Sequence, residues 1–78
     1  MDDTIRDILA KFLKLAPHQI GPGTAIGQVD GWDSTVHMRI MFALEDAFGI
    51  ELDESRIVTM TSFPKICDTV RDLAAGRG

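Results

Sequence analysis

The spacing of the apolar residues most constrains what this chain can fold into. In three parts of the sequence they recur at steps of three and four residues, which places them along one face of an α-helix. Nowhere do apolar and polar residues alternate over a stretch long enough for a sheet. A chain of 78 residues is also short enough to form one domain. The pattern predicts an all-α bundle and a single domain over residues 1–78.

The first predicted helix spans Thr4–Leu15. Asp2 or Asp3 is expected to cap its N-terminus, and Pro17 is expected to end it. Its apolar face is predicted to hold Ile5, Ile8, Leu9, Phe12 and Leu15.

A long connection, residues 16–33, follows this helix. It is interrupted by Pro17, Gly21, Pro22, Gly23, Gly27 and Gly31, so neither a regular helix nor a strand is expected. A loop of this length in a compact domain is usually functional or held down by its own side chains. The predicted anchors of the loop are Ile20, Ile26 and Val29.

The second helix is predicted to begin at Asp33-Ser34 and to end at Phe48-Gly49, with glycine as the residue that closes it. Its expected apolar face holds Ile40, Met41, Leu44, Ala47 and Phe48. One shared core is predicted for Ile8, Phe12, Leu44, Phe48 and Ile66. A narrow stripe on the opposite face is formed by Thr35, Arg39, Phe42 and Asp46.

The remaining chain predicts one short helix and one long helix. Residues 50–52 form an extended linker, and Asp53 is expected to cap a short helix that ends near Ile57. The last helix should start at a Ser62 cap with Pro64 in its first turn. Its apolar face is predicted to hold Phe63, Ile66, Cys67, Val70 and Leu73, and residues 75–78 are expected to fray. The sum is three principal helices plus one short helix.

The charge balance narrows the range of partners. Eight basic and twelve acidic residues give a formal net charge of −4, and the basic residues are scattered. Nucleic acids and anionic membranes are bound mainly by clustered Lys and Arg, so neither is expected as a partner. An acidic surface suits a partner with a basic patch. The acidic first turn and the absence of an apolar run after it predict a cytoplasmic protein.

The single cysteine, Cys67, is predicted to be a core residue. One cysteine forms no internal disulfide, and no cluster of metal-ligand residues surrounds it, so no metal site is expected.

The sequence GWDST at positions 31–35 contains the residues that indicate a chemical function. It places Ser34 in the first turn of a helix directly after a long loop. Unpaired backbone N–H groups and the helix dipole at that end favour an attached phosphate. Asp33 is expected to cap the helix and to help a partner enzyme hold a metal ion near the phosphate.

The stretch WDSTVHMRIMFALEDAFGIEL, residues 32–52, resembles the acyl carrier protein family. That family has an Asp-Ser pair at the start of its second helix and a Glu-x-x-Phe-Gly-Ile ending, which here falls on residues 45–50. The resemblance implies an acyl-carrier-like bundle in which Ser34 receives 4′-phosphopantetheine from coenzyme A. A phosphopantetheinyl transferase makes this attachment with magnesium, and the arm then carries an acyl group as a thioester. It also implies a monomer that catalyses nothing and serves acyl- or aminoacyl-loading and -using enzymes.

Three positions depart from the family pattern. Thr35 replaces a leucine, Arg39 stands where an acidic residue is common, and Trp32 precedes the aspartate. They favour a specialised pathway, and an aminoacyl or D-alanyl carrier is the alternative within the class. The expected partner contacts are Thr35, Arg39, Phe42, Glu45 and Asp46.

Two other classes of function are weighed against the carrier. An unmodified helical interaction module would use Phe42 and its acidic neighbours. A hydrolase would need His37, three residues after Ser34, to act as a base, but a domain this small offers little room for an oxyanion hole. We therefore expect His37 to be half-buried in the core, His18 to face solvent, and Trp32 to anchor the loop.

Overall fold

The computed structural model describes residues 1–76 and confirms the all-α prediction. These residues form α1 (Asp2–Leu13), a 3-10 helix η1 (Pro17–Gln19), α2 (Ser34–Phe48), α3 (Glu54–Ile57) and α4 (Phe63–Ala74). Within this part of the chain the only β pairing consists of two isolated bridges. The predicted fraying of residues 75–78 falls partly on residues 77 and 78, which lie outside the described residues.

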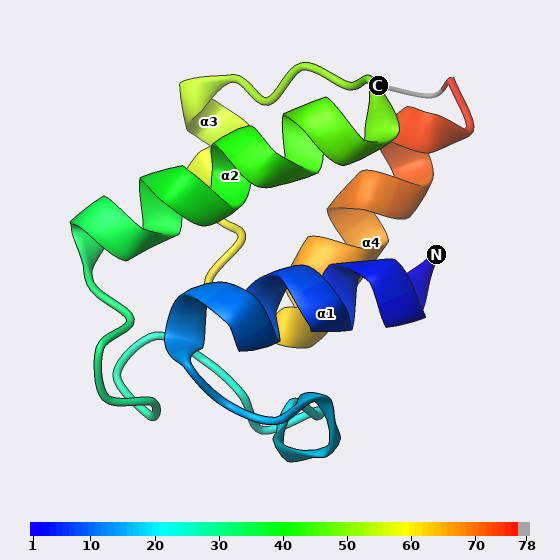
Figure 1. The fold of residues 1–78 in the computed structure, drawn as a ribbon. Helices are drawn as coiled ribbons and strands as arrows, with labels where there is room; N and C mark the ends of the chain where they lie inside the picture. Colours follow the sequence, from blue (N-terminus) through cyan, green and yellow to red (C-terminus); the bar gives the residue numbers. More distant parts are fainter. Residues whose placement is uncertain (77–78) are drawn as a thin grey trace.

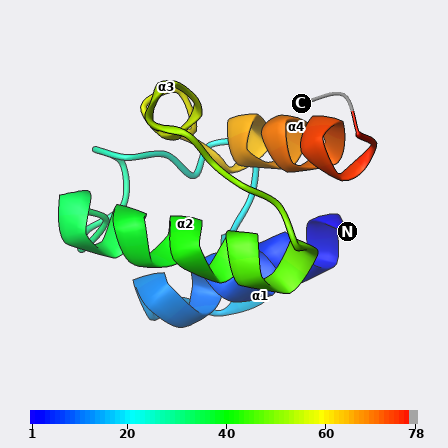
Figure 2. The ribbon, with the colours of Figure 1, turned by 90° about the horizontal axis from the view of Figure 1, so that it is seen from above.

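The helices form two layers. Helices α1 and α2 run side by side in opposite directions in the front layer of Figure 1, and α3 and α4 lie behind them (Figures 1 and 2). The start of α1 and the end of α4 meet, because Arg71 Nη2 lies 3.1 Å from Asp2 Oδ1. The opposite end of the molecule is where the long loop enters α2 (Figure 1).

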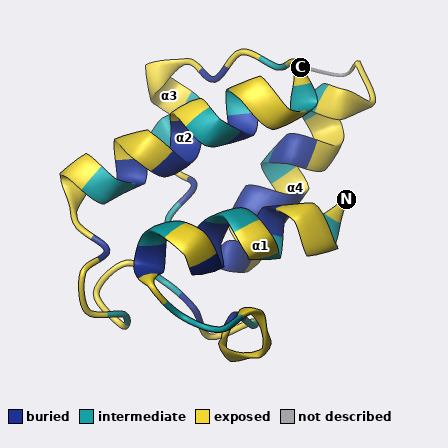
Figure 3. Cartoon of the chain, in the orientation of Figure 1, coloured by how far each residue is buried: buried dark blue, intermediate teal, exposed yellow. Residues whose placement is uncertain are grey.

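The buried faces of α1, α2 and α4 meet in one core (Figure 3). Leu44 and Ile66 are completely buried there, as predicted. The prediction was wrong in degree for Ile8, Phe12 and Phe48, which are only partly buried and pack at the margin of the core. Ala47 was also assigned to the buried face but is exposed, because the buried arc of α2 is formed by His37, Ile40, Met41 and Leu44.

The predicted boundaries of α1 were wrong at both ends. Its N-cap is Met1 and no side chain makes a capping hydrogen bond, so neither Asp2 nor Asp3 has that role. The helix ends at Leu13, because Lys14 adopts a left-handed conformation with φ 58° and its N–H donates to the carbonyl of Ala10. Leu13 is therefore buried while Leu15 is only partly buried, and Pro17 starts η1 instead of ending α1.

The other helix ends agree with the sequence signals. The side chains of the three predicted caps accept hydrogen bonds from backbone N–H groups three residues later: Asp33 from Val36 at 2.9 Å, Asp53 from Arg56 at 2.9 Å and Ser62 from Lys65 at 3.3 Å. Gly49 closes α2 with φ 64°. These local bonds set where each helix begins and ends.

The long loop is held by backbone hydrogen bonds as well as by buried side chains. The N–H of Ile26 donates to the carbonyl of Thr61 at 2.9 Å, and the N–H of Phe63 donates to the carbonyl of Thr24 at 2.9 Å. Of the three predicted anchors, Ile20 is buried and Val29 is partly buried, but Ile26 is 39% exposed. The backbone pairing at Ile26 fixes the loop to the start of α4, so its side chain is not needed as an anchor.

Candidate functional site

Ser34 is the first residue of α2 and is exposed. Asp33 precedes it in an extended conformation, with φ −106° and ψ −175°, and Asp33 Oδ1 caps the helix at the N–H of Val36. No hydrogen bond within residues 1–76 involves the Ser34 side chain. The cap thus presents the hydroxyl at a fixed position on the surface, free to react.

The first turn of α2 provides a suitable environment for an anion. The N–H groups of Ser34 and Thr35 have no acceptor within the described part of the chain. Unpaired N–H groups at a helix N-terminus and the positive end of the helix dipole both stabilise negative charge. A phosphoryl group esterified to Ser34 Oγ would lie at this end of the helix, so the residues present fit a phosphate-linked group.

Behind the serine, Trp32 and His37 form a buried pair. Trp32 is 4% exposed and His37 is 8% exposed. Trp32 Nε1 lies 3.1 Å from His37 Nδ1, and His37 Nε2 lies 3.1 Å from the carbonyl oxygen of Ile57. An indole N–H only donates, so Nδ1 accepts and the proton of the imidazole is on Nε2, which donates to Ile57. Trp32 is the predicted loop anchor, and His37 is a core histidine that is more buried than expected.

These hydrogen bonds argue against a hydrolase in which His37 would act as the base for Ser34. Both ring nitrogens of His37 are engaged, and the ring is buried while Ser34 is exposed. His37 is therefore not placed to take a proton from the serine. Among residues 1–76, no three His, Cys, Asp or Glu side chains gather in a way that would hold a metal ion.

The predicted stripe on α2 is exposed at all four positions, Thr35, Arg39, Phe42 and Asp46. Phe42 is 60% exposed. Arg39, Phe42 and Asp46 line a shallow groove whose other walls are Phe12, Ala43, Glu45, Ile50 and Glu51. The sequence analysis placed Phe12 in the core, but its partly buried ring also reaches this groove.

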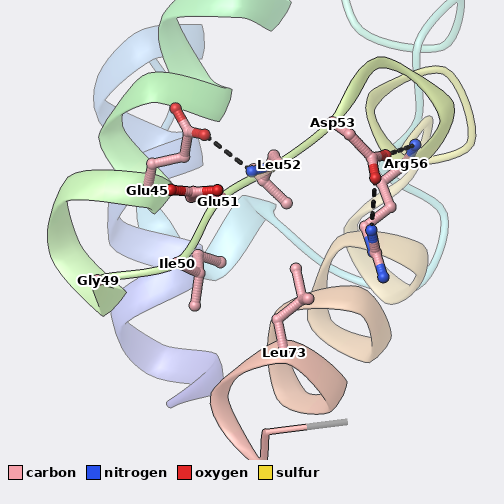
Figure 4. Close-up of a pocket in the computed structure, with 8 residues that line it drawn as sticks. All are labelled: Glu45, Gly49, Ile50, Glu51, Leu52, Asp53, Arg56 and Leu73. Carbon is pink, nitrogen blue, oxygen red and sulfur yellow. Dashed lines mark hydrogen bonds and ion pairs between the residues drawn. The ribbon is translucent and has the colours of Figure 1, made fainter. Parts of the chain in front are cut away.

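Glu45 differs from the four residues of the stripe. It is partly buried, and its Oε2 accepts a hydrogen bond from the N–H of Leu52 at 2.8 Å (Figure 4). This bond holds the connection that leaves α2. The sequence pattern did not reveal it, because the two residues meet only after the chain has turned at Gly49.

A pocket lies at the far end of α2 from Ser34 (Figure 4). Ile50, Leu52 and Leu73 form its apolar side, and it is also lined by Glu45, Gly49, Glu51, Asp53 and Arg56. Hydrogen bonds from the Ser55 hydroxyl and the Arg56 N–H hold the pKa of Asp53 below its ordinary value. Glu45 lies about 16 Å from Ser34 along the helix, at 1.5 Å per residue. The pocket is therefore separate from the serine site.

A helical bundle that presents an unbonded serine hydroxyl at a capped helix N-terminus fits a protein that carries a phosphate-linked group. The family described as "Phosphopantetheine attachment site" matches residues 3–75, and this chain belongs to that family. The resemblance to acyl carrier proteins is thereby confirmed, and so is 4′-phosphopantetheine as the covalent cofactor. Carrier domains of this family generally catalyse no reaction themselves and act with transferases and partner enzymes. A comparison with curated proteins gives no match.

No helix within residues 1–76 combines the length and the hydropathy that a membrane crossing requires.

Proposed function

We propose that Ser34 carries the 4′-phosphopantetheine arm and that the protein delivers acyl groups to the enzymes of a specialised biosynthetic pathway. The observation that supports this proposal best is the exposed Ser34 hydroxyl, which makes no hydrogen bond at the capped start of α2. When attached, the arm supplies a terminal thiol that holds the acyl group as a thioester.

In this proposal the residues around Ser34 have separate roles. Ser34 Oγ attacks the phosphorus atom of coenzyme A that bears the pantetheine, the pyrophosphate bond breaks, and the nucleotide part leaves as adenosine bisphosphate while the serine proton passes to a base of the transferase. Asp33 Oδ1 caps the helix and keeps the serine in place, while its second oxygen is available to a magnesium ion held by the transferase. The N–H groups of Ser34 and Thr35 stabilise the phosphate after attachment.

We further propose that Thr35, Arg39, Phe42 and Asp46 contact the partner enzymes. A partner that reaches the arm passes over this face, since the stripe begins one residue after Ser34 and follows α2. The large exposed area of Phe42 has no explanation in folding, whereas aromatic residues are enriched in protein interfaces. Glu45 is proposed to contribute less to this contact, because its carboxylate already binds Leu52.

The choice between an acyl and an aminoacyl or D-alanyl cargo depended partly on Trp32. The burial of Trp32 and its bond to His37 account for this residue by packing. The packing of Trp32 is compatible with either cargo, and the acyl carrier remains our proposal.

The site is tested by the intact mass of the apo protein after incubation with coenzyme A and a promiscuous phosphopantetheinyl transferase. We expect the parent to gain the mass of one phosphopantetheine and Ser34→Ala to gain none. Ser55→Ala is the matched control, since Ser55 is another exposed serine in the first turn of a helix, and it should be modified like the parent. Modification of Ser34→Ala would show that the site is elsewhere, and an unmodified parent would contradict the carrier function.

A further inference from the structure

We infer that His37 is a positioning residue for the modification of Ser34, which rests on the proposal that Ser34 is the attachment site. His37 follows Ser34 by about one helical turn but points into the core instead of toward the serine hydroxyl. Each of its ring nitrogens holds a different segment, Trp32 at 3.1 Å and the carbonyl of Ile57 at 3.1 Å. One side chain thus connects the loop before Ser34, the helix that begins there, and α3.

The bond to Ile57 adds a polar contact to the packing of α3, whose Ile57 lies partly buried against the core between the buried residues Leu52 and Met60. This helix has only four residues and none of them is buried. Figures 1 and 2 show α3 behind α2, in the layer of α4 and in the half of the molecule where α2 begins. The hydrogen bond from His37 Nε2 holds the end of α3 directly against α2.

An exposed apolar residue follows each of the two hydrogen-bonded residues in the chain. Met38 follows His37 in the chain and is 36% exposed, and Val58 follows Ile57 and is 65% exposed. In this inference the bond fixes the arrangement of α2 and α3 that a transferase meets as it approaches Ser34.

The bond to Trp32 acts on the other side of the serine. Trp32 immediately precedes Asp33, the residue that caps α2. The indole is held by His37, and the backbone N–H of Trp32 donates to the carbonyl of Val29 at 3.3 Å. His37 thereby keeps the chain that leads into the cap in position, and with it the place at which the start of α2 is presented to the transferase.

Loss of the two hydrogen bonds of His37 is expected to weaken binding by the transferase more than it slows the transfer step. If the arrangement that the transferase recognises is only partly populated, the apparent affinity of the transferase for the apo protein is reduced in proportion to the populated fraction. His37 does not contact the reacting atoms, so the chemical step is unaffected once the complex has formed. Loss of its two hydrogen bonds should therefore raise the KM for the apo protein and leave kcat nearly unchanged.

The test compares three variants as apo proteins with coenzyme A and a promiscuous transferase. His37→Phe keeps an aromatic ring and removes both hydrogen bonds, and we expect its KM to rise about fivefold or more. His37→Gln retains one acceptor and one donor and should recover part of the loss. Val70→Ala, in the core of α4, is the control for general destabilisation and should keep the KM of the parent at a temperature where it is folded.

A second measurement needs no enzyme. Trp32 is the only tryptophan, so its fluorescence reports on this site alone. In the folded apo protein we expect emission at longer wavelength for His37→Phe than for the parent, because an indole without its partner becomes more accessible to water. Trp32→Phe removes only one of the two bonds, so it should raise KM by less than His37→Phe does, and it serves in place of that variant if His37→Phe does not fold.

The inference is overturned if His37→Phe has the same KM as Val70→Ala, or if His37→Gln is no better than His37→Phe. If the Trp32 variant has to be used alone, a KM equal to that of the parent overturns the inference. These outcomes are distinct from a failure of the proposed function, which would appear as modification of Ser34→Ala or as no modification of the parent.

Discussion

Trp32 and Phe42, two large aromatic residues close to Ser34 in the sequence, have opposite environments. Trp32 is 4% exposed and its N–H is bonded to His37, whereas Phe42 is 60% exposed on the outer face of α2. A buried indole is stable only when its N–H finds an acceptor, and His37 provides one. Folding thus explains the tryptophan but not the phenylalanine, which is the reason to assign Phe42 to a partner surface.

Cys67 is a buried residue whose reactivity can be predicted. Removal from water, followed by the nearby charge of Asp2, raises the pKa of its thiol from 9.0 to about 11. The folded state therefore favours the neutral thiol. The resulting stabilisation is present below pH 9 and is lost as the pH rises through 9 toward 11.

We accordingly expect Cys67 to resist alkylation by iodoacetamide at pH 8, because the thiolate is the reactive form. By intact mass, the folded apo protein should gain no label and the holo protein one, on the thiol of the arm. The apo protein in urea should gain one label, which serves as the positive control. Labelling of the folded apo protein at the rate of a free cysteine would contradict the burial of Cys67.

At the scale of the elements, α1 and α2 end in the same backbone conformation with different residues. Lys14 has φ 58° and ψ 43°, and Gly49 has φ 64° and ψ 36°. The left-handed conformation costs a residue with a Cβ roughly 1–2 kcal/mol, while glycine adopts it freely. The end of α1 therefore contains a strain that the end of α2 avoids.

Substitutions at these two positions should change stability in opposite directions. Lys14→Gly should raise the free energy of unfolding by about 0.5 kcal/mol, because the relief of strain exceeds the added entropy of the unfolded chain. Gly49→Ala should lower it by about 1–2 kcal/mol. Urea denaturation measures both, and a stabilising Gly49→Ala would show that α2 ends in another way.

At the scale of the whole molecule, the net charge of −4 favours basic partners. We propose that the stripe on α2 selects among them. In the resembled family the positions of Thr35 and Arg39 usually hold a leucine and an acid. Arg39 would repel the basic patch of an enzyme built for that pattern, which slows association. A general fatty-acid-pathway enzyme should therefore accept this protein poorly.

The double change Thr35→Leu with Arg39→Glu should raise the rate at which a fatty-acid-pathway transferase loads the holo protein. The gain should be larger at low salt than at high salt, because screening weakens the charge contribution. Lys65→Glu, a charge reversal on the exposed face of α4, is the matched control and should give a much smaller change. Equal rates for the parent and the double variant would mean that the stripe does not select partners.

Several features that depend on neighbours a few residues apart were predictable from the sequence, although both ends of α1 were not. The caps Asp33, Asp53 and Ser62 each bond an N–H three residues later, so the pattern of residue types was enough to place them. The buried face of α2 followed from helical spacing, apart from Ala47 at its margin. The position of Ser34 at the start of that helix followed in the same way.

Only the tertiary structure decided the contacts between distant segments. His37 binds Ile57 twenty residues further along the chain, and the loop backbone pairs with the start of α4. Such bonds depend on how the helices pack together. The spacing of apolar residues within one segment does not specify which other segment it packs against. The same reason explains the misplaced anchor Ile26. The sequence by itself thus determined which helices form and which serine begins α2, and packing determined what holds the surroundings of that serine in place.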